Sequence, residues 1–132
     1  MDSFDRDKKN CVIIDDWRAK TTADKNRLDR FFGFCSTHHN TTILYATQDV
    51  FSLFSPVIRR MSNVFILWKS FDENQLKMIA NRVGMAYDEV LQIMTDLDFG
   101  PKDNLCIDKT DDTPAPLRKN LFQIIAEEEI VE

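Results

Sequence analysis

Glycine is scarce in this chain of 132 residues, and its scarcity excludes one class of phosphate-binding site. The sequence contains only Gly33, Gly84 and Gly100, which lie far apart. A glycine-rich phosphate loop needs several neighbouring glycines, because its backbone amides must approach the phosphates closely. These 132 residues therefore contain no such loop.

Other absences narrow the class of protein. Cys11, Cys35 and Cys106 are widely spaced and form no CxxC pair, which excludes metal knuckles and thioredoxin-type sites. Such cysteines are typical of reduced, buried thiols in an intracellular protein. The sequence has no signal peptide and no apolar run of membrane-spanning length. Its net charge of −5 offers no overall attraction to DNA or to an anionic membrane.

Length and composition predict one globular domain. The hydrophobic fraction is 43%, which is ordinary for a chain with a single core. We expect residues 1–9 to be a charged lead-in, residues 10–126 to form the core, and residues 127–132 to be a solvated acidic tail.

Hydrophobic patterning predicts an alternation of strands and helices. Apolar, β-branched runs indicate strands at 11–14, 41–47, 63–69 and 104–107, and helical spacing indicates helices at 24–38, 72–83 and 87–97. Residues 117–126 fit either a strand or a helix. Alternating strands and helices favour βαβ units, so the predicted fold is α/β, with a mostly parallel sheet flanked by helices. The first three strands read as buried on both faces.

The first strand ends in two adjacent acids, Asp15 and Asp16. Ligands of open α/β sheets bind at the carboxyl ends of strands. Two neighbouring carboxylates repel each other, so a cation or a metal-bound phosphate beside them is favoured. The alternative is that one acid caps the following turn, where Thr21, Thr22 and Asp24 are further capping candidates.

The second strand is followed by Gln48. If the first two strands are neighbours, Gln48 lies beside Asp15 and Asp16, where an amide can orient a water molecule or sense a phosphate oxygen. The alternative is a glutamine that satisfies loop backbone groups.

Two further pairs of polar residues are candidates for a site. Arg59 and Arg60 end an apolar segment around Pro56, and the dipole of a helix C-terminus would favour them there. His38 and His39 form a metal pair only if other ligands converge on them. The sequence indicates none, so we interpret them as a polar turn.

Taken in order, these motifs resemble the C-terminal half of a P-loop ATPase. The resemblance is to the FtsK/HerA-type DNA-packaging ATPases of large eukaryotic DNA viruses, virophages and Maverick-type elements, and it covers residues 10–122. It rests on a strand ending in two acids, a histidine-bearing turn, a strand ending in Thr-Gln, and an arginine before another apolar strand: Asp15-Asp16, His38-His39, Thr47-Gln48 and Arg59 or Arg60.

The resemblance implies a role for each matching residue. Asp15 would hold the magnesium of Mg-ATP through water, and Asp16, in a Walker B-like position, would polarise the attacking water. Gln48 would act as the sensor, and Arg59 or Arg60 would reach the nucleotide of a neighbouring subunit. The implied setting is a viral protein in the host cytoplasm, the nucleus or the virion, with DNA as a partner in a full assembly.

The sequence departs from that family in two places. Thr37 stands where an arginine often precedes the histidine, and the GxxxxGK[ST] loop that cradles the phosphates is missing. We therefore expect a truncated product, a separately expressed half or a degenerate relative. Such a domain is a partial P-loop NTPase-like domain that binds Mg-ATP weakly or not at all. Loss of an interior strand leaves edges unpaired, so a homo-oligomer or a complex with the missing half is expected.

Two other classes also place acids at strand ends. A receiver-type phosphoacceptor domain would need a third aspartate and a later lysine, for which Asp49 and Lys109 are the candidates. A metal-dependent nuclease would combine Asp15 and Asp16 with Asp49 or Asp108 to hold two cations. For the receiver class, Asp49 follows too closely after Asp16, and Lys109 lacks the usual proline after it. For the nuclease class, no lysine or histidine is evidently placed with the acids.

Overall fold

The computed structural model describes residues 7–17, 20–38, 40–47, 55–69 and 72–126. Its contacts divide the chain into two compact units, Met1–Ser62 and Asn63–Glu132, and each is described by itself. The expectation of a single domain stays a prediction. None of the helices described here is long and apolar enough to cross a membrane.

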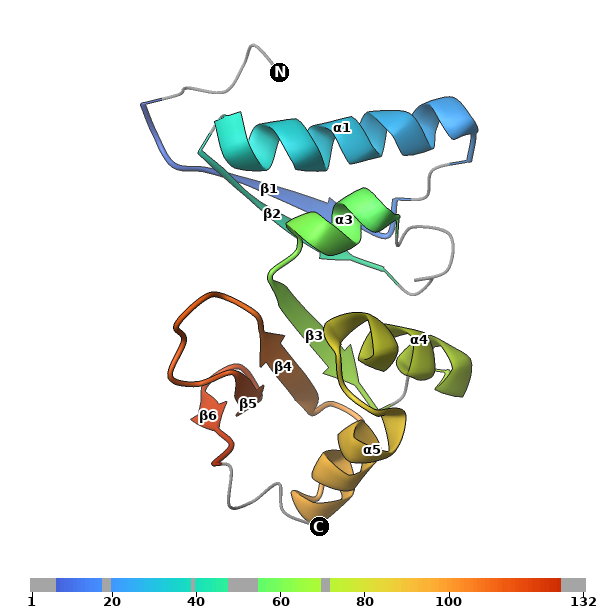
Figure 1. Ribbon diagram of the computed structural model, residues 1–132, viewed down its shortest axis with the longest axis vertical. Coiled ribbons are helices and arrows are strands. Elements are labelled where there is room, and N and C mark those ends of the chain that lie inside the picture. The colour runs from blue at the N-terminus through green and yellow to red at the C-terminus, as the bar shows by residue number, and fades with distance from the viewer. Residues whose placement is uncertain (1–6, 18–19, 39, 48–54, 70–71, 127–132) are drawn as a thin grey trace. The chain divides into compact units, whose positions relative to one another are not determined.

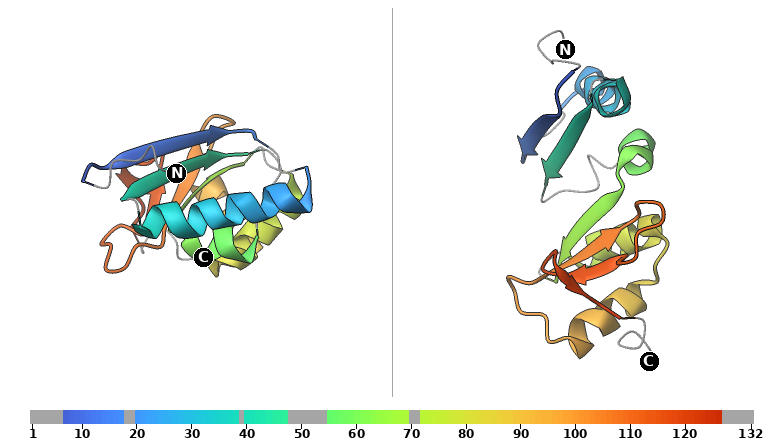
Figure 2. Two further views of the ribbon diagram at one scale, coloured as in Figure 1. Left: turned by 90° about the horizontal axis from the view of Figure 1, so that it is seen from above. Right: turned by 90° about the vertical axis from the view of Figure 1, so that its left-hand side faces the viewer.

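The first unit is built on a parallel strand pair joined by a helix. Strand β1 (Asn10–Asp15) is followed by helix α1 (Thr22–His38), strand β2 (Thr41–Ala46) and the short helix α3 (Pro56–Met61). The two strands run side by side in the same direction, with α1 on one side of them (Figures 1 and 2). A parallel pair needs a long crossover, and the 17-residue helix α1 supplies it.

Apolar residues on one side of the strand pair form the core of this unit. Leu28 and Phe32 of α1 and Ile58 of α3 are buried, and four partly buried hydrophobic residues pack against them: Ile14, Phe31, Ile43 and Tyr45. Successive strand residues point to opposite faces, so the register Val12↔Ile43 and Ile14↔Tyr45 directs these side chains toward the helices.

The second unit contains an antiparallel sheet and two helices. Strand β3 (Val64–Trp68) leads to α4 (Glu73–Val83) and α5 (Tyr87–Asp96). Strands β4 (Asn104–Asp108), β5 (Leu117–Lys119) and β6 (Gln123–Ile124) follow. The strand order is β3-β4-β5-β6, and every pairing in this sheet is antiparallel. Strand β4 is central, with three consecutive buried residues: Leu105, Cys106 and Ile107.

Helix α4 begins and ends where the sequence predicts. The Asp72 carboxylate accepts a hydrogen bond from the amide of Asn74, which caps the first turn. Gly84 ends the helix in the left-handed region at φ 81°. The amide of Met85 then donates to the carbonyl of Ala80 at 2.9 Å, which closes the helix C-terminus.

The α/β class is confirmed, but the mostly parallel sheet is wrong for the second unit. A βαβ unit has one helix between its two strands, which therefore run in the same direction. Two helices, α4 and α5, connect β3 to β4, and the second helix reverses the chain again, so β4 runs antiparallel to β3. The loop between β4 and β5 and the turn between β5 and β6 are also short, whereas parallel strands need a crossover of about a dozen residues or more. Among the described strands, only β1 and β2 are parallel.

Burial of the first three strands on both faces is also wrong for the described residues. Ile13 of β1 is 72% exposed, Leu44 of β2 is 52% exposed, and Val64 and Ile66 of β3 are exposed. In the first unit, the described core lies on one face of the strand pair. The thiol of Cys11 is correspondingly exposed, against expectation, while that of Cys106 is buried as expected.

The two glycines with contrasting backbones give a matched test of this fold. Gly84→Ala puts a Cβ into the left-handed region and should destabilise the chain by about 1–2 kcal/mol. Gly33→Ala lies inside α1, where its Cβ would meet Val57 at an ordinary 3.8 Å, and should stabilise by up to about 1 kcal/mol. Urea denaturation followed by circular dichroism measures both. Equal effects of the two substitutions would contradict the assigned backbone at Gly84.

Candidate functional site

The two acids lie at the carboxyl end of the parallel pair. Asp15 is the last residue of β1 and is in register with Ala46, the last residue of β2. The amide of Asp16 donates to the carbonyl of Ala46 at 2.9 Å, which extends the pairing one residue further. The premise that the first two strands are neighbours is therefore confirmed, and both acids lie beside the point where β2 leads into Thr47.

Both carboxylates are accessible to a ligand. Asp15 and Asp16 are exposed, and within the described residues no hydrogen bond or ion pair engages either carboxylate. Asp16 has a φ of 50°, a left-handed conformation that aspartate tolerates better than most residues. The cap of α1 comes from elsewhere, because Thr21 Oγ1 accepts a hydrogen bond from the amide of Asp24 at 3.1 Å.

Tyr45 is a further member of this site that sequence reasoning missed. Its hydroxyl donates a hydrogen bond to the carbonyl of Trp17, which ties β2 to the segment just beyond the acids. Burial raises the pKa of the Tyr45 phenol, and the negative charge of Asp16 raises it further. The phenol is therefore neutral at physiological pH, and Tyr45 acts here as a hydrogen-bond donor. The only signal in the sequence was an aromatic residue near the end of a strand.

The other predicted site residues are placed only in part. Gln48 and His39 lie outside the described residues. Arg59 and Arg60 fall in the last turn of α3, where Arg60 is exposed. This position agrees with the helix-dipole interpretation of the pair. His38 is the last residue of α1.

Helix α3 is anchored to α1 through its first turn. Ser55 caps α3 by accepting a hydrogen bond from the amide of Ile58 at 3.1 Å. Its hydroxyl also donates to Asp29 of α1 at 2.6 Å. Since Ile58 is buried against α1, these contacts fix the backbone that carries Arg59 and Arg60 relative to the β1–α1–β2 unit.

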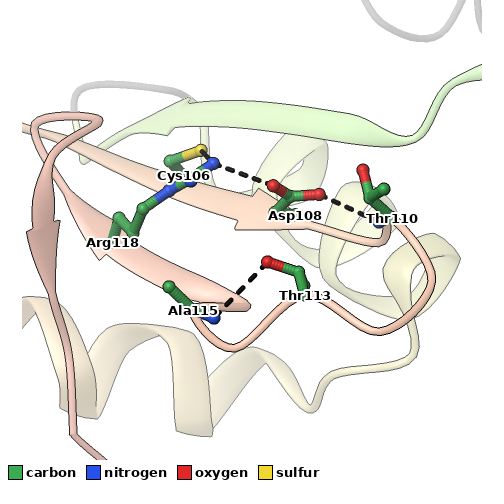
Figure 3. A network of polar contacts seen from close by, with 6 residues as sticks. All are labelled: Cys106, Asp108, Thr110, Thr113, Ala115 and Arg118. Atoms are coloured by element: carbon green, nitrogen blue, oxygen red, sulfur yellow. Dashed lines mark hydrogen bonds and ion pairs between the residues drawn. The ribbon is translucent and has the colours of Figure 1, made fainter.

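The second unit contains a separate polar network (Figure 3). Nη2 of Arg118 on β5 donates to Asp108 at 2.9 Å and to the Cys106 thiol at 3.4 Å, both on β4. The amide of Thr110 donates to the same carboxylate at 2.9 Å. Hydrogen bonds from Thr110 and the nearby Arg118 charge lower the pKa of Asp108. This network stabilises the chain at neutral pH, and its contribution is lost as the pH falls through the lowered Asp108 pKa.

These contacts assign Asp108 a structural role. Its carboxylate joins two strands and the start of the loop between them, so it is already engaged within its own unit. The nuclease interpretation would need it as a metal ligand. Across the part of the chain that the structure describes, no three His, Cys, Asp or Glu residues gather closely enough to hold a metal ion.

The antiparallel sheet of the second unit differs from the sheet that the receiver interpretation needs. Receiver domains have a doubly wound parallel sheet, whereas β3 and β4 run in opposite directions here. Asp49, the third aspartate that this interpretation needs, lies outside the described residues.

Comparisons of this chain with known proteins found no similar protein. No protein-family model, no curated protein and no solved structure matches this chain. Any function must therefore be inferred from the residues of the chain itself.

Replacing both acids by their amides tests whether they have a structural role. Asp15→Asn with Asp16→Asn should leave the melting temperature unchanged or raise it by up to about 4 °C, because it removes a like-charge repulsion. Thermal melts at neutral pH without divalent metal, at a protein concentration low enough to keep the chain monomeric, measure this.

The matched control is the loop pair Asp111 and Asp112. Both are exposed, and Asp112 has the same left-handed backbone as Asp16, with a φ of 60°. The Asn versions of the two pairs should behave alike. A clear drop in melting temperature for the β1 pair alone would mean that its carboxylates make structural hydrogen bonds.

Proposed function

We propose that this chain is a relative of the FtsK/HerA-type viral DNA-packaging ATPases that acts by association with itself or with a partner. It keeps the two-acid strand of a partial P-loop NTPase-like domain, but these 132 residues contain no phosphate loop. As an isolated chain it is not a competent ATPase.

The observation that carries this proposal is the position of Asp15 and Asp16. They end a strand of a parallel β1–α1–β2 unit, at the edge where β2 also ends. This is where α/β folds bind their ligands. Their exposed carboxylates, without a partner among the described residues, are consistent with a site retained for a cation rather than with a cap.

The residues present fit a magnesium ion better than they fit a nucleotide. Mg²⁺ is commonly held by one or two carboxylates together with water and substrate phosphates, and Asp15 can supply such a ligand while Asp16 lies next to it. The triphosphate has no matching cradle, because the sequence contains no GxxxxGK[ST] segment. Gln48, Arg59 and Arg60 keep their proposed roles only in an assembly in which another segment supplies the phosphate contacts.

Exposed apolar surface supports the association part of the proposal. Ile13 and Leu44 are register partners on the strand pair, and both are largely exposed. Each strand also has an edge that pairs with no other described strand. Unpaired edges and apolar faces favour association with another chain.

DNA is proposed as a partner only within a larger assembly. Residues 1–62 contain ten Lys and Arg against eight Asp and Glu, whereas residues 63–132 contain seven against fourteen. The second unit also carries a pair of consecutive helices, but α5 contains no Lys or Arg that could contact phosphates. The balance of charge therefore favours the first unit for any DNA contact by this chain.

Calorimetric titration with Mg-ATP tests the nucleotide part of the proposal. The chain should show no binding, or binding weaker than about millimolar, because no backbone amides surround the phosphates. The Asp15→Asn, Asp16→Asn variant should remove whatever weak heat remains. The Asp111→Asn, Asp112→Asn variant should leave that heat unchanged.

Micromolar affinity would contradict the proposal, because it would require another segment of this chain to replace the phosphate loop. If only the Asp111→Asn, Asp112→Asn variant lost the weak heat of binding, the cation would bind away from β1.

A further inference from the structure

The β1–β2 pair has a face that no described helix of the first unit covers. Alternation along the strands separates the residues that pack against α1 and α3 from those that point the other way. The second set is exposed throughout and is called the outer face: Cys11, Ile13, Asp15, Thr42, Leu44 and Ala46. Its centre is apolar, since the register places Ile13 beside Leu44.

The charges along this face have a direction. Lys9, exposed and immediately before β1, continues the alternation of Cys11 and Ile13 at one end, and Asp15 lies at the other. Neither side chain has a described ion-pair partner. The face therefore runs from a positive end through an apolar centre to a negative end.

We infer that the occupant of the outer face is a second copy of this chain, packed face to face with its strands antiparallel. The inference rests on the proposed function in one respect, since it specifies how the chain associates with itself. A two-fold axis lies in the plane of contact, perpendicular to the strands and level with Val12. It brings Lys9 of each copy opposite Asp15 of the other, which joins opposite charges twice.

The same axis also matches the sizes of the side chains. Residues equally distant from the level of Val12 face each other, so Cys11 lies opposite Ile13 of the second copy and Thr42 lies opposite its Leu44. A small side chain therefore meets a large one at each central position, which lets two sheets about 10 Å apart interdigitate. A parallel arrangement in which β1 faces β1 would instead place Lys9 against Lys9 and Asp15 against Asp15.

Charge reversal tests this arrangement, with sedimentation equilibrium at micromolar concentration as the measurement. Lys9→Glu alone and Asp15→Lys alone should each raise the dimer Kd about tenfold, because each creates two like-charge pairs. An equimolar mixture of the two variants should recover association as a heterodimer. In that heterodimer, the carboxylate that Lys9→Glu introduces lies opposite the ammonium group that Asp15→Lys introduces. The second contact is still the native one, between Asp15 of the first variant and Lys9 of the second.

The controls for charge reversal lie outside the outer face. They are Lys25→Glu on α1 and Asp111→Lys in the β4–β5 loop, both at exposed positions. Because neither side chain belongs to the outer face, both variants should keep the wild-type Kd.

Removal of apolar contact tests the centre of the face. Ile13→Thr keeps a β-branched side chain but loses apolar surface, and it should also raise the dimer Kd about tenfold. Val64→Thr, at an exposed position of β3, is the matched control and should leave the Kd unchanged. Labelling of the Cys11 thiol, followed by peptide mass analysis, should become slower as the protein concentration rises.

Three results would overturn the inference. If Lys9→Glu and Ile13→Thr both associate as strongly as the wild type, the chains associate through a strand edge instead of the outer face. The proposed function would then stand. Failure of the mixed variants to recover association would exclude the antiparallel arrangement. A monomeric wild type that Ile13→Thr destabilises more than Val64→Thr would mean that the chain covers this face itself.

Discussion

The parallel pairing of β1 with β2 is the constraint on which the proposed site depends. Helix α1 must cross over between the two strands, and its buried residues Leu28 and Phe32 hold it against one face of the pair. This packing aligns the carboxyl ends of the strands, so that Asp15 lies opposite Ala46 and the Asp16 amide bonds to the Ala46 carbonyl. The exposure of the opposite face follows from the same arrangement, because α1 and α3 share one side.

The second unit is held together by different interactions. Its central strand β4 is buried, the helices α4 and α5 supply most of its remaining apolar core, and Arg118 links β4 to β5 through Asp108 and Cys106. Lys119 makes a further tie, because its ammonium group donates to the carbonyl of Leu97 just beyond α5. None of these groups contributes an exposed pair of carboxylates at a strand end, so the candidate site lies in the first unit.

Local features of the sequence predicted the elements well. The limits of α4 follow from a capping aspartate and a helix-ending glycine, Asp72 and Gly84, whose roles depend only on neighbouring backbone. The site could be predicted as far as the order of two strands and the acids that end the first. Strand direction in the second unit could not. The two helices between β3 and β4 were both predicted from their spacing, but that spacing does not determine in which direction the next strand runs.

The remaining differences arise from contacts between residues distant in the sequence. A short run such as Cys11–Ile14 has the same composition whether one face or both faces are covered, so the exposure of Ile13 leaves no trace in it. Arg118 and Asp108 meet because the hairpin register brings Cys106 opposite Arg118. Tyr45 reaches Trp17 only after the crossover is complete.

We propose that the chain, with a two-acid strand but no phosphate loop within these 132 residues, associates independently of nucleotide. Sedimentation equilibrium of the unmodified chain at micromolar concentration, with and without Mg-ATP, tests it most directly. The account predicts a species larger than the 15.4 kDa monomer, with the same mass in both conditions. A monomer in both conditions, or assembly that appears only when Mg-ATP is added, would contradict it.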